Sequence, residues 1–168
     1  MPLWRRLLAD LGVEPRVVLV SRHPDEVAGS LQRRDGLPVA IGELLWARYL
    51  LEAVRGSDGC RRGMVAYHQL LDDWRGTIGR IDQALGLGLS PDARQAKAID
   101  AFLSPQLRHH RARGEALDGV LAPLAPLAAG ALAQADVDAA QRGFDAGMAT
   151  VEPVVDGYAA LLSESRSQ

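Results

Sequence analysis

The sequence predicts an α/β protein that is mostly helical and has about two parallel strands. Two short segments rich in apolar residues, 17–21 and 63–67, have the length and composition of strands. Each is followed by a stretch in which apolar residues recur at the spacing of an amphipathic helix. Strands that alternate with helices in this way are typical of a parallel sheet covered by helices.

The composition is that of an ordinary globular protein. The chain has 168 residues, 48% of them hydrophobic, which is enough for one domain with a sizeable core. The formal net charge of -2 gives no basis for a general nucleic-acid surface. Cys60 is the only cysteine, so a reducing compartment is expected. No apolar run has the length of a membrane span and no signal-peptide pattern is present, so we expect a cytoplasmic protein without membrane partners.

The first half of the chain contains the central unit of the predicted fold. A short helix over 3–11 leads into the strand 17–21, whose consecutive apolar residues predict burial on both faces. Pro24 suits the first turn of a helix, where its missing N–H would have no partner, and the helical pattern continues over 24–34. The chain there is therefore expected to form a strand, a tight turn and a helix.

The second predicted strand lies between helices. A long helix is predicted over 39–55, and the strand 63–67 leads into one amphipathic helix over 70–85. A further helix is expected over 93–102, with Ser90 as its cap.

The last third of the chain is rich in alanine and leucine. Two helices are predicted in it, over 131–148 and 151–162, the first of them weakened by glycines. We expect residues 1–113 to form the α/β part and residues 114–168 to form a helical tail that packs on it.

The turn after the first strand has the features of an anion site. The carboxyl end of a strand and the N-terminus of the following helix together attract phosphate groups. Arg22 stands at the strand end with a planar fork of donors, and Ser30 lies about two helical turns further on. The two side chains are therefore expected to hold one phosphate group from two sides.

These residues resemble a known family motif. In RVVLVSRHPDEVAGS, the Arg-x-Pro at Arg22 followed by Ser30 resembles the 3′-phosphate-binding motif of the PAPS-dependent sulfotransferases, where PAPS is 3′-phosphoadenosine 5′-phosphosulfate. A second segment, MVAYHQLLDDWRGTIGRIDQALGL, resembles the family's strand that ends in Tyr-Glu-x-Leu, with His68 at the position of the Glu. The resemblance implies the C-terminal portion of a P-loop-like three-layer α/β fold. It also implies that Arg22 and Ser30 hold the 3′-phosphate of PAPS.

Other parts of the family pattern are missing from this sequence. No Gly-rich loop with Ser or Thr precedes Arg22, and the family's catalytic base also belongs upstream of that position. We therefore assign no catalytic residue and no metal. The parent activity implied is transfer of a sulfuryl group from PAPS to a hydroxyl or amine acceptor, with this chain inactive alone. A separate N-terminal half or a second copy of the chain is the expected protein partner, because the first strand would otherwise keep an unpaired edge.

The segment 107–113 is the most basic stretch of the chain. By the same resemblance, Arg108 and Arg111 would add contacts to the nucleotide, although a solvated basic face is an equal alternative. Adjacent His109 and His110 point apart on a helix or strand, which disfavours a metal site. The segment is short and has no interleaved aromatic residue, which disfavours nucleic-acid binding.

Two other functions remain as alternatives. A non-catalytic helical interaction module derived from a sulfotransferase would suit the missing loop and the Ala-rich tail. A remnant of a P-loop kinase is disfavoured, because neither a Walker lysine nor an acidic metal ligand follows a strand.

Overall fold

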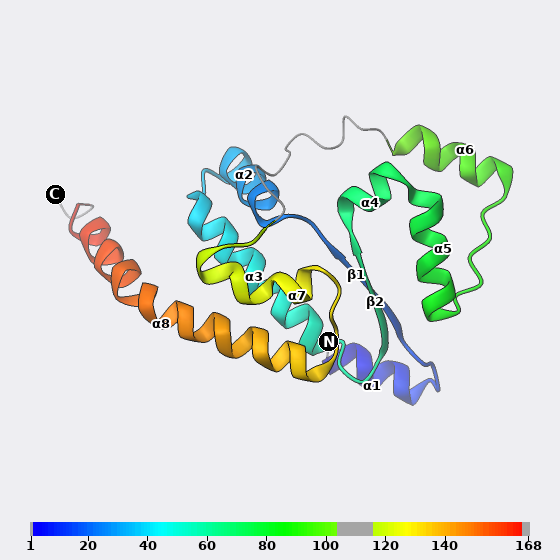
Figure 1. Ribbon diagram of the computed structural model, residues 1–168, viewed down its shortest axis with the longest axis horizontal. Coiled ribbons are helices and arrows are strands. Elements are labelled where there is room, and N and C mark those ends of the chain that lie inside the picture. Colours follow the sequence, from blue (N-terminus) through cyan, green and yellow to red (C-terminus); the bar gives the residue numbers. More distant parts are fainter. Residues whose placement is uncertain (1, 104–115, 166–168) are drawn as a thin grey trace.

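The computed structural model describes residues 2–103 and 116–165, which form a mostly helical chain around a small parallel sheet (Figure 1). None of the described helices combines the length and the apolar composition that a bilayer span requires. The elements in chain order are α1 (Pro2–Asp10), β1 (Arg16–Ser21), α2 (Pro24–Asp35), α3 (Val39–Gly56), β2 (Arg61–Ala66), α4 (Tyr67–Asp72), α5 (Trp74–Leu85), α6 (Ala93–Phe102), the 3₁₀ helix η2 (Gly119–Leu124), α7 (Ala125–Ala128) and α8 (Gln134–Ser165).

The two strands pair in parallel, and the helices α2 and α3 connect them. Their register runs from Arg16 opposite Arg61 to Ser21 opposite Ala66, so both strands end at the same edge of the sheet. The prediction of a mostly helical α/β chain with two parallel strands is confirmed.

Helices cover the two faces of the sheet unequally. On one face, Leu19 and Met64 pack against the large core formed with α3 and the C-terminal segment. On the other face, α5 packs mainly on β2, where Val65 packs with Ile81 and Leu85. From β1, the guanidinium of Arg16 donates to the carbonyls of Leu85 and Gly86 at the end of α5. Figure 1 shows α3 and α5 on opposite sides of the strands.

The prediction that β1 is buried on both faces is wrong. Val18 and Val20 are 39% and 58% exposed, whereas Leu19 between them packs on the core. Successive side chains of a strand point to opposite faces, and a face is buried only where another layer covers it. Since α5 packs against the β2 half of its face, the β1 half stays uncovered among the described residues.

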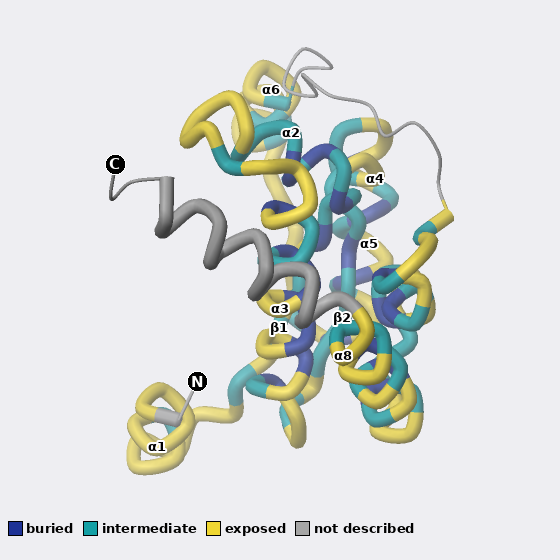
Figure 2. The backbone as a smooth tube through the Cα atoms, turned by 90° about the vertical axis from the view of Figure 1, so that its left-hand side faces the viewer, coloured by how far each residue is buried: buried dark blue, intermediate teal, exposed yellow. Residues whose placement is uncertain are grey.

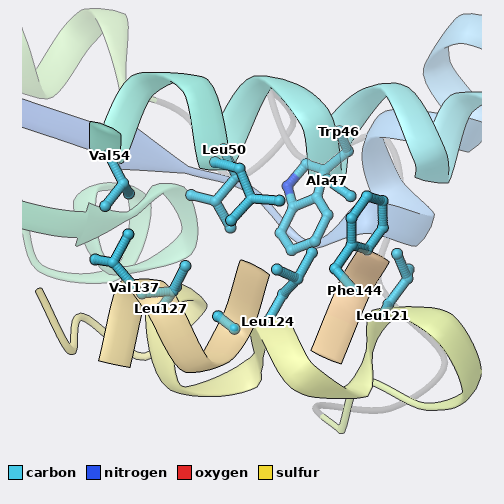
Figure 3. Packing of buried hydrophobic residues seen from close by; sticks show 11 residues of the cluster. Trp46, Ala47, Leu50, Val54, Leu121, Leu124, Leu127, Val137 and Phe144 are labelled. Carbon is cyan, nitrogen blue, oxygen red and sulfur yellow. The ribbon is translucent and has the colours of Figure 1, made fainter. Parts of the chain in front are cut away.

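The largest core cluster joins α3 to the C-terminal segment (Figure 3). Trp46, Leu50 and Val54 recur along α3 at the spacing of one helical face. They lie opposite Leu124 and Leu127, which are fully buried. The alanine- and leucine-rich tail therefore supplies half of this core.

Two predicted helix boundaries are wrong because aspartates cap helices there. The expected helix over 70–85 is two helices, since the Asp73 carboxylate accepts a 2.9 Å hydrogen bond from the Gly76 N–H and starts α5. Helix α6 is capped by Asp92, whose carboxylate accepts from the Gln95 N–H at 2.7 Å, and not by Ser90.

The two helices predicted over 131–148 and 151–162 are one continuous helix, α8. The sequence predicts that its glycines weaken it, but they are positions of close approach to η2. A Cβ at Gly143 would lie 2.6 Å from Pro123 Cβ, and one at Gly147 would lie 3.3 Å from Val120 Cγ1. The glycines thus allow α8 to pack tightly on η2.

The N-terminal helix α1 is present as predicted, but it lies to one side of the body (Figure 2). Its apolar side chains Leu3 and Trp4 are mostly exposed. Exposed apolar side chains therefore lie both on α1 and, at Val18 and Val20, on β1.

We predict that Gly42→Ala destabilises the protein by about 1–3 kcal/mol, because it overpacks the contact between α2 and α3. A Cβ at Gly42 would lie 2.7 Å from Ala28 Cα, so α2 would have to move. Urea unfolding measures the change in the free energy of unfolding.

The matched control is Gly79→Ala in α5, where an added Cβ meets nothing within 4 Å. A glycine in a helix interior is less favourable than alanine, so this variant should gain about 0.5–1 kcal/mol. Equal effects of the two substitutions would contradict the close α2–α3 packing.

Candidate functional site

Arg22 directly follows β1, and three contacts hold it. Its Nε donates a 2.8 Å hydrogen bond to Glu26 Oε2, and its guanidinium carbon lies 5.2 Å from the centre of the Tyr67 ring. Its backbone carbonyl accepts a 2.8 Å hydrogen bond from the indole N–H of Trp46. The end of β1 is therefore fixed through both the main chain and the side chain of Arg22.

Glu26 is a buried partner for this arginine. It lies in the first turn of α2, and its side chain is only 3% exposed, against 27% for that of Arg22. A buried carboxylate needs a cation or several donors to remain ionised. The ion pair between Arg22 and Glu26 is therefore partly buried, unlike an ion pair on the surface.

The outer part of the guanidinium remains available. Every hydrogen bond that the described residues make with the Arg22 side chain uses Nε. The two terminal nitrogens make none within the described part of the chain. An arginine held in this way can offer its terminal nitrogens to a phosphate or carboxylate in bidentate geometry.

Sequence reasoning gave Tyr67 no role, yet the structure brings it to Arg22. Tyr67 begins α4 immediately after β2, and Arg22 follows β1. Because Ser21 and Ala66 are opposite each other in the parallel register, the residues after them meet at one edge. The signal in the sequence was that both segments follow strands of one parallel sheet.

The N-terminus of α2 differs from the expected anion site, because His23 already occupies its free N–H groups. Pro24 has no N–H, and the Asp25 N–H donates to His23 Nδ1 at 3.3 Å. The N–H groups of Glu26 and Val27 donate to the His23 carbonyl, each at 3.1 Å. The expectation that this helix start supplies backbone donors to an anion is therefore corrected.

The other predicted binding residues are placed less closely. Ser30 lies on α2, two turns after its start, and is half-buried. The structure records no hydrogen bond between Ser30 and Arg22, so their joint hold on one phosphate stays a prediction. Arg108 and Arg111 lie outside the described residues, and their contribution also stays a prediction.

A small pocket of about 250 Å³ lies beside the turn at His23. Its lining includes Asp25, Glu43 and Asp118, and burial together with the charges of the two aspartates raises the pKa of Glu43. The Nε2 atom of His23 is buried and has no hydrogen-bond partner among the described residues. This acidic lining would repel a phosphate, so the pocket does not suit the predicted anion, and Arg22 remains the candidate to hold it.

A larger pocket of about 450 Å³ lies between α3 and α8. Its lining includes the apolar side chains of Leu44, Leu51, Phe144 and Met148. It contains none of the residues of the Arg22 site. Among the described residues, no group of three or more histidines, cysteines or acids is arranged to hold a metal ion.

Comparisons of the chain with protein-family models, with curated proteins and with solved structures gave no match.

We predict that Glu43→Gln stabilises the protein increasingly as pH rises above the ordinary glutamate pKa of about 4.3, because the pKa of Glu43 in the folded protein is raised. The folded state raises the pKa of Glu43, so the wild type keeps its full stability only below the ordinary pKa and loses some as this group ionises. Urea unfolding across this pH range measures the difference between variant and wild type.

The control is Glu52→Gln, an exposed glutamate on the same helix. The free energy of unfolding of Glu43→Gln is compared with that of the wild type. If the difference stays constant with pH, or shrinks as pH rises, the raised pKa of Glu43 is contradicted.

Proposed function

We propose that this chain is the nucleotide-binding part of a sulfotransferase-like protein, in which Arg22 holds the 3′-phosphate of PAPS. The observation that carries the proposal is the position and state of Arg22. It stands at the carboxyl end of a parallel strand, is oriented by a buried glutamate, and keeps its terminal nitrogens free of bonds to described residues. This is where open α/β sheets bind phosphorylated ligands.

The chemistry of the site favours a phosphate over other anions. A phosphate monoester presents several oxygens, and a planar guanidinium can donate to two of them at once. Ser30 would add a neutral hydroxyl donor from α2, and Arg108 and Arg111 would add positive charge. These contacts bind and orient the nucleotide, and none of them acts on the reacting bond.

The reaction itself needs groups that we assign to no residue of this chain. In sulfuryl transfer, the bond from sulfur to the bridging oxygen breaks and a bond from sulfur to the acceptor oxygen or nitrogen forms. The acceptor must also lose a proton to a base within hydrogen-bond reach, and cations must stabilise the charge that develops. We therefore propose that the chain is inactive alone.

We further propose that a separate N-terminal half, or a second copy of this chain, covers the face of β1 on which Val18 and Val20 are exposed. The apolar side chains Val18 and Val20 are the centre of this surface, and Trp4 lies exposed on α1. Exposed edges and apolar faces of this kind favour pairing with another chain.

The decisive experiment is calorimetric titration of the chain with 3′-phosphoadenosine 5′-phosphate. We expect binding that AMP, which lacks the 3′-phosphate, does not reproduce. Arg22→Lys keeps the charge but loses the fork, and should weaken binding roughly 10- to 100-fold, the size of a charge-assisted hydrogen bond. Arg22→Lys is preferred to Arg22→Ala, which would remove the cation that is paired with the buried Glu26.

Two variants complete this titration. Ser30→Ala should weaken binding by a smaller factor, since it removes one neutral donor. Arg48→Lys, at an exposed arginine that also pairs with a glutamate, should leave binding unchanged. A folded chain that does not bind the 3′-phosphorylated nucleotide, or that binds AMP equally well, would overturn the proposal and favour the non-catalytic interaction module.

We also predict that the isolated chain self-associates, and that Val18→Thr with Val20→Thr reduces this self-association. Threonine keeps the branched shape that suits a strand but removes apolar surface. Light scattering across a concentration series gives the mass. Tyr49→Ser, at an exposed residue of α3, is the control and should not change the mass. A monomeric wild type at all concentrations would count against an uncovered interface.

A further inference from the structure

We infer that Glu26 and Tyr67 are positioning residues, which fix the guanidinium of Arg22 so that the site recognises a phosphate monoester by geometry more than by charge. The inference rests on the proposed function for the identity of the ligand. Its structural half, that these two residues hold Arg22, concerns this chain alone and can be tested without any ligand.

The two contacts restrain different motions of the guanidinium. The hydrogen bond from Nε to Glu26 Oε2 fixes how the group is turned about its long axis. The Tyr67 ring lies against it, 5.2 Å from ring centre to guanidinium carbon, and limits movement out of the plane. An arginine held by both contacts has one orientation, whereas a free arginine samples many rotamers.

The same contacts select the edge by which a ligand can be bound. A guanidinium can meet an oxyanion either through Nε and one terminal nitrogen or through both terminal nitrogens. Glu26 already occupies Nε, which leaves the edge with the two terminal nitrogens. A ligand with two suitably spaced oxygens, such as a phosphate monoester, fits that edge.

Among the described residues of this site, the positive charge of Arg22 is offset by carboxylates. Glu26 balances the charge of Arg22, and Asp25 adds a further negative charge in the same helical turn. The first N–H groups of α2 are bonded to His23 and add no free donor. Within the described part of the site, selectivity would therefore come from how well the donors of Arg22 are placed.

The chain contains a matched pair that shows what is special at Arg22. In α3, Arg48 Nε donates to Glu52 Oε1 at 2.9 Å, with the same spacing of four residues. The side chains of that pair are 74% and 57% exposed, against 27% and 3% for Arg22 and Glu26. Exposed pairs of this kind contribute little and hold their side chains weakly.

The test of positioning is the NMR signal of the arginine Nε–H groups in the full chain. In the wild type, the Arg22 signal should be protected from exchange with water, and the Arg48 signal should exchange rapidly. Glu26→Gln keeps an oxygen acceptor without the charge and should retain the protected signal. Glu26→Ala should lose it, while Glu52→Ala should leave Arg22 unchanged.

The test of recognition is titration of the same variants with 3′-phosphoadenosine 5′-phosphate. Glu26→Ala should weaken binding roughly 10- to 100-fold, as the ordered bidentate contact is lost. Glu26→Gln and Tyr67→Phe, which keep the acceptor and the ring, should bind like the wild type. Tyr67→Leu should weaken binding, because it removes the flat surface beside the guanidinium.

The outcomes separate this inference from the proposed function. If Glu26→Ala keeps both the protected signal and the wild-type affinity, the positioning role is overturned while the proposed function stands. If Glu26→Gln and Glu26→Ala both bind the nucleotide more tightly than the wild type, removal of a negative charge and not geometry governs the site, and the inference is again wrong. A wild type with a protected Arg22 signal but no nucleotide binding would overturn the ligand and the proposed function, and leave the positioning role supported.

If Glu26→Ala fails to fold, Glu26→Gln and the two Tyr67 variants still decide the matter. Equal affinity of Tyr67→Phe and Tyr67→Leu would then contradict the role of the ring. A purely structural role would lower the melting temperature of these variants without changing either the Nε–H signal or the selectivity over AMP.

Discussion

The hydrogen bond from the indole of Trp46 to the backbone carbonyl of Arg22 ties the core to the site. The ring of Trp46 belongs to the cluster that α3 shares with the C-terminal segment, and its N–H reaches the residue that ends β1. A buried indole N–H needs an acceptor, and a strand end has a carbonyl to offer. Because one side chain meets both needs, the packing of α3 on the C-terminal helices also determines where Arg22 stands.

The parts of the fold that follow from local pattern could be predicted from the sequence. The two strands and the helix that starts at Pro24 were of this kind, because apolar spacing and helix-start residues act over a few neighbours. Burial of both faces of β1 could not be judged in this way. It depends on whether another layer covers the strand, and α5 packs mainly on the β2 half of that face, leaving Val18 and Val20 exposed. The break at Asp73 could not be predicted, because the apolar spacing continues across it. The new helix begins there through a single hydrogen bond, from the Gly76 N–H to the Asp73 carboxylate.

The candidate site shows the same division between local and distant information. The position of Arg22 at a strand end is local, and the sequence was sufficient to predict it. The approach of Tyr67 depends on the pairing of β1 with β2, which are separated by two helices, and the capture of the helix N–H groups by His23 depends on side-chain conformation. Such contacts are set by tertiary structure, so residue types and spacing could indicate an anion site but could not show which donors remain free.

Because the first N–H groups of α2 are bonded to His23, the proposed anion would receive no backbone donors from this helix. In many α/β proteins the backbone N–H groups of the helix bear the phosphate, and side chains assist. In this chain Pro24 and His23 remove those donors, and Glu26 offsets the charge of Arg22, so the proposed ligand would depend on well-placed hydrogen bonds from the described residues. An arginine on a flexible arm would serve such a site poorly, since ordering it on binding would offset the gain. The buried Glu26, which would otherwise be an unfavourable neighbour for a phosphate, is then explained by the order that it imposes on Arg22.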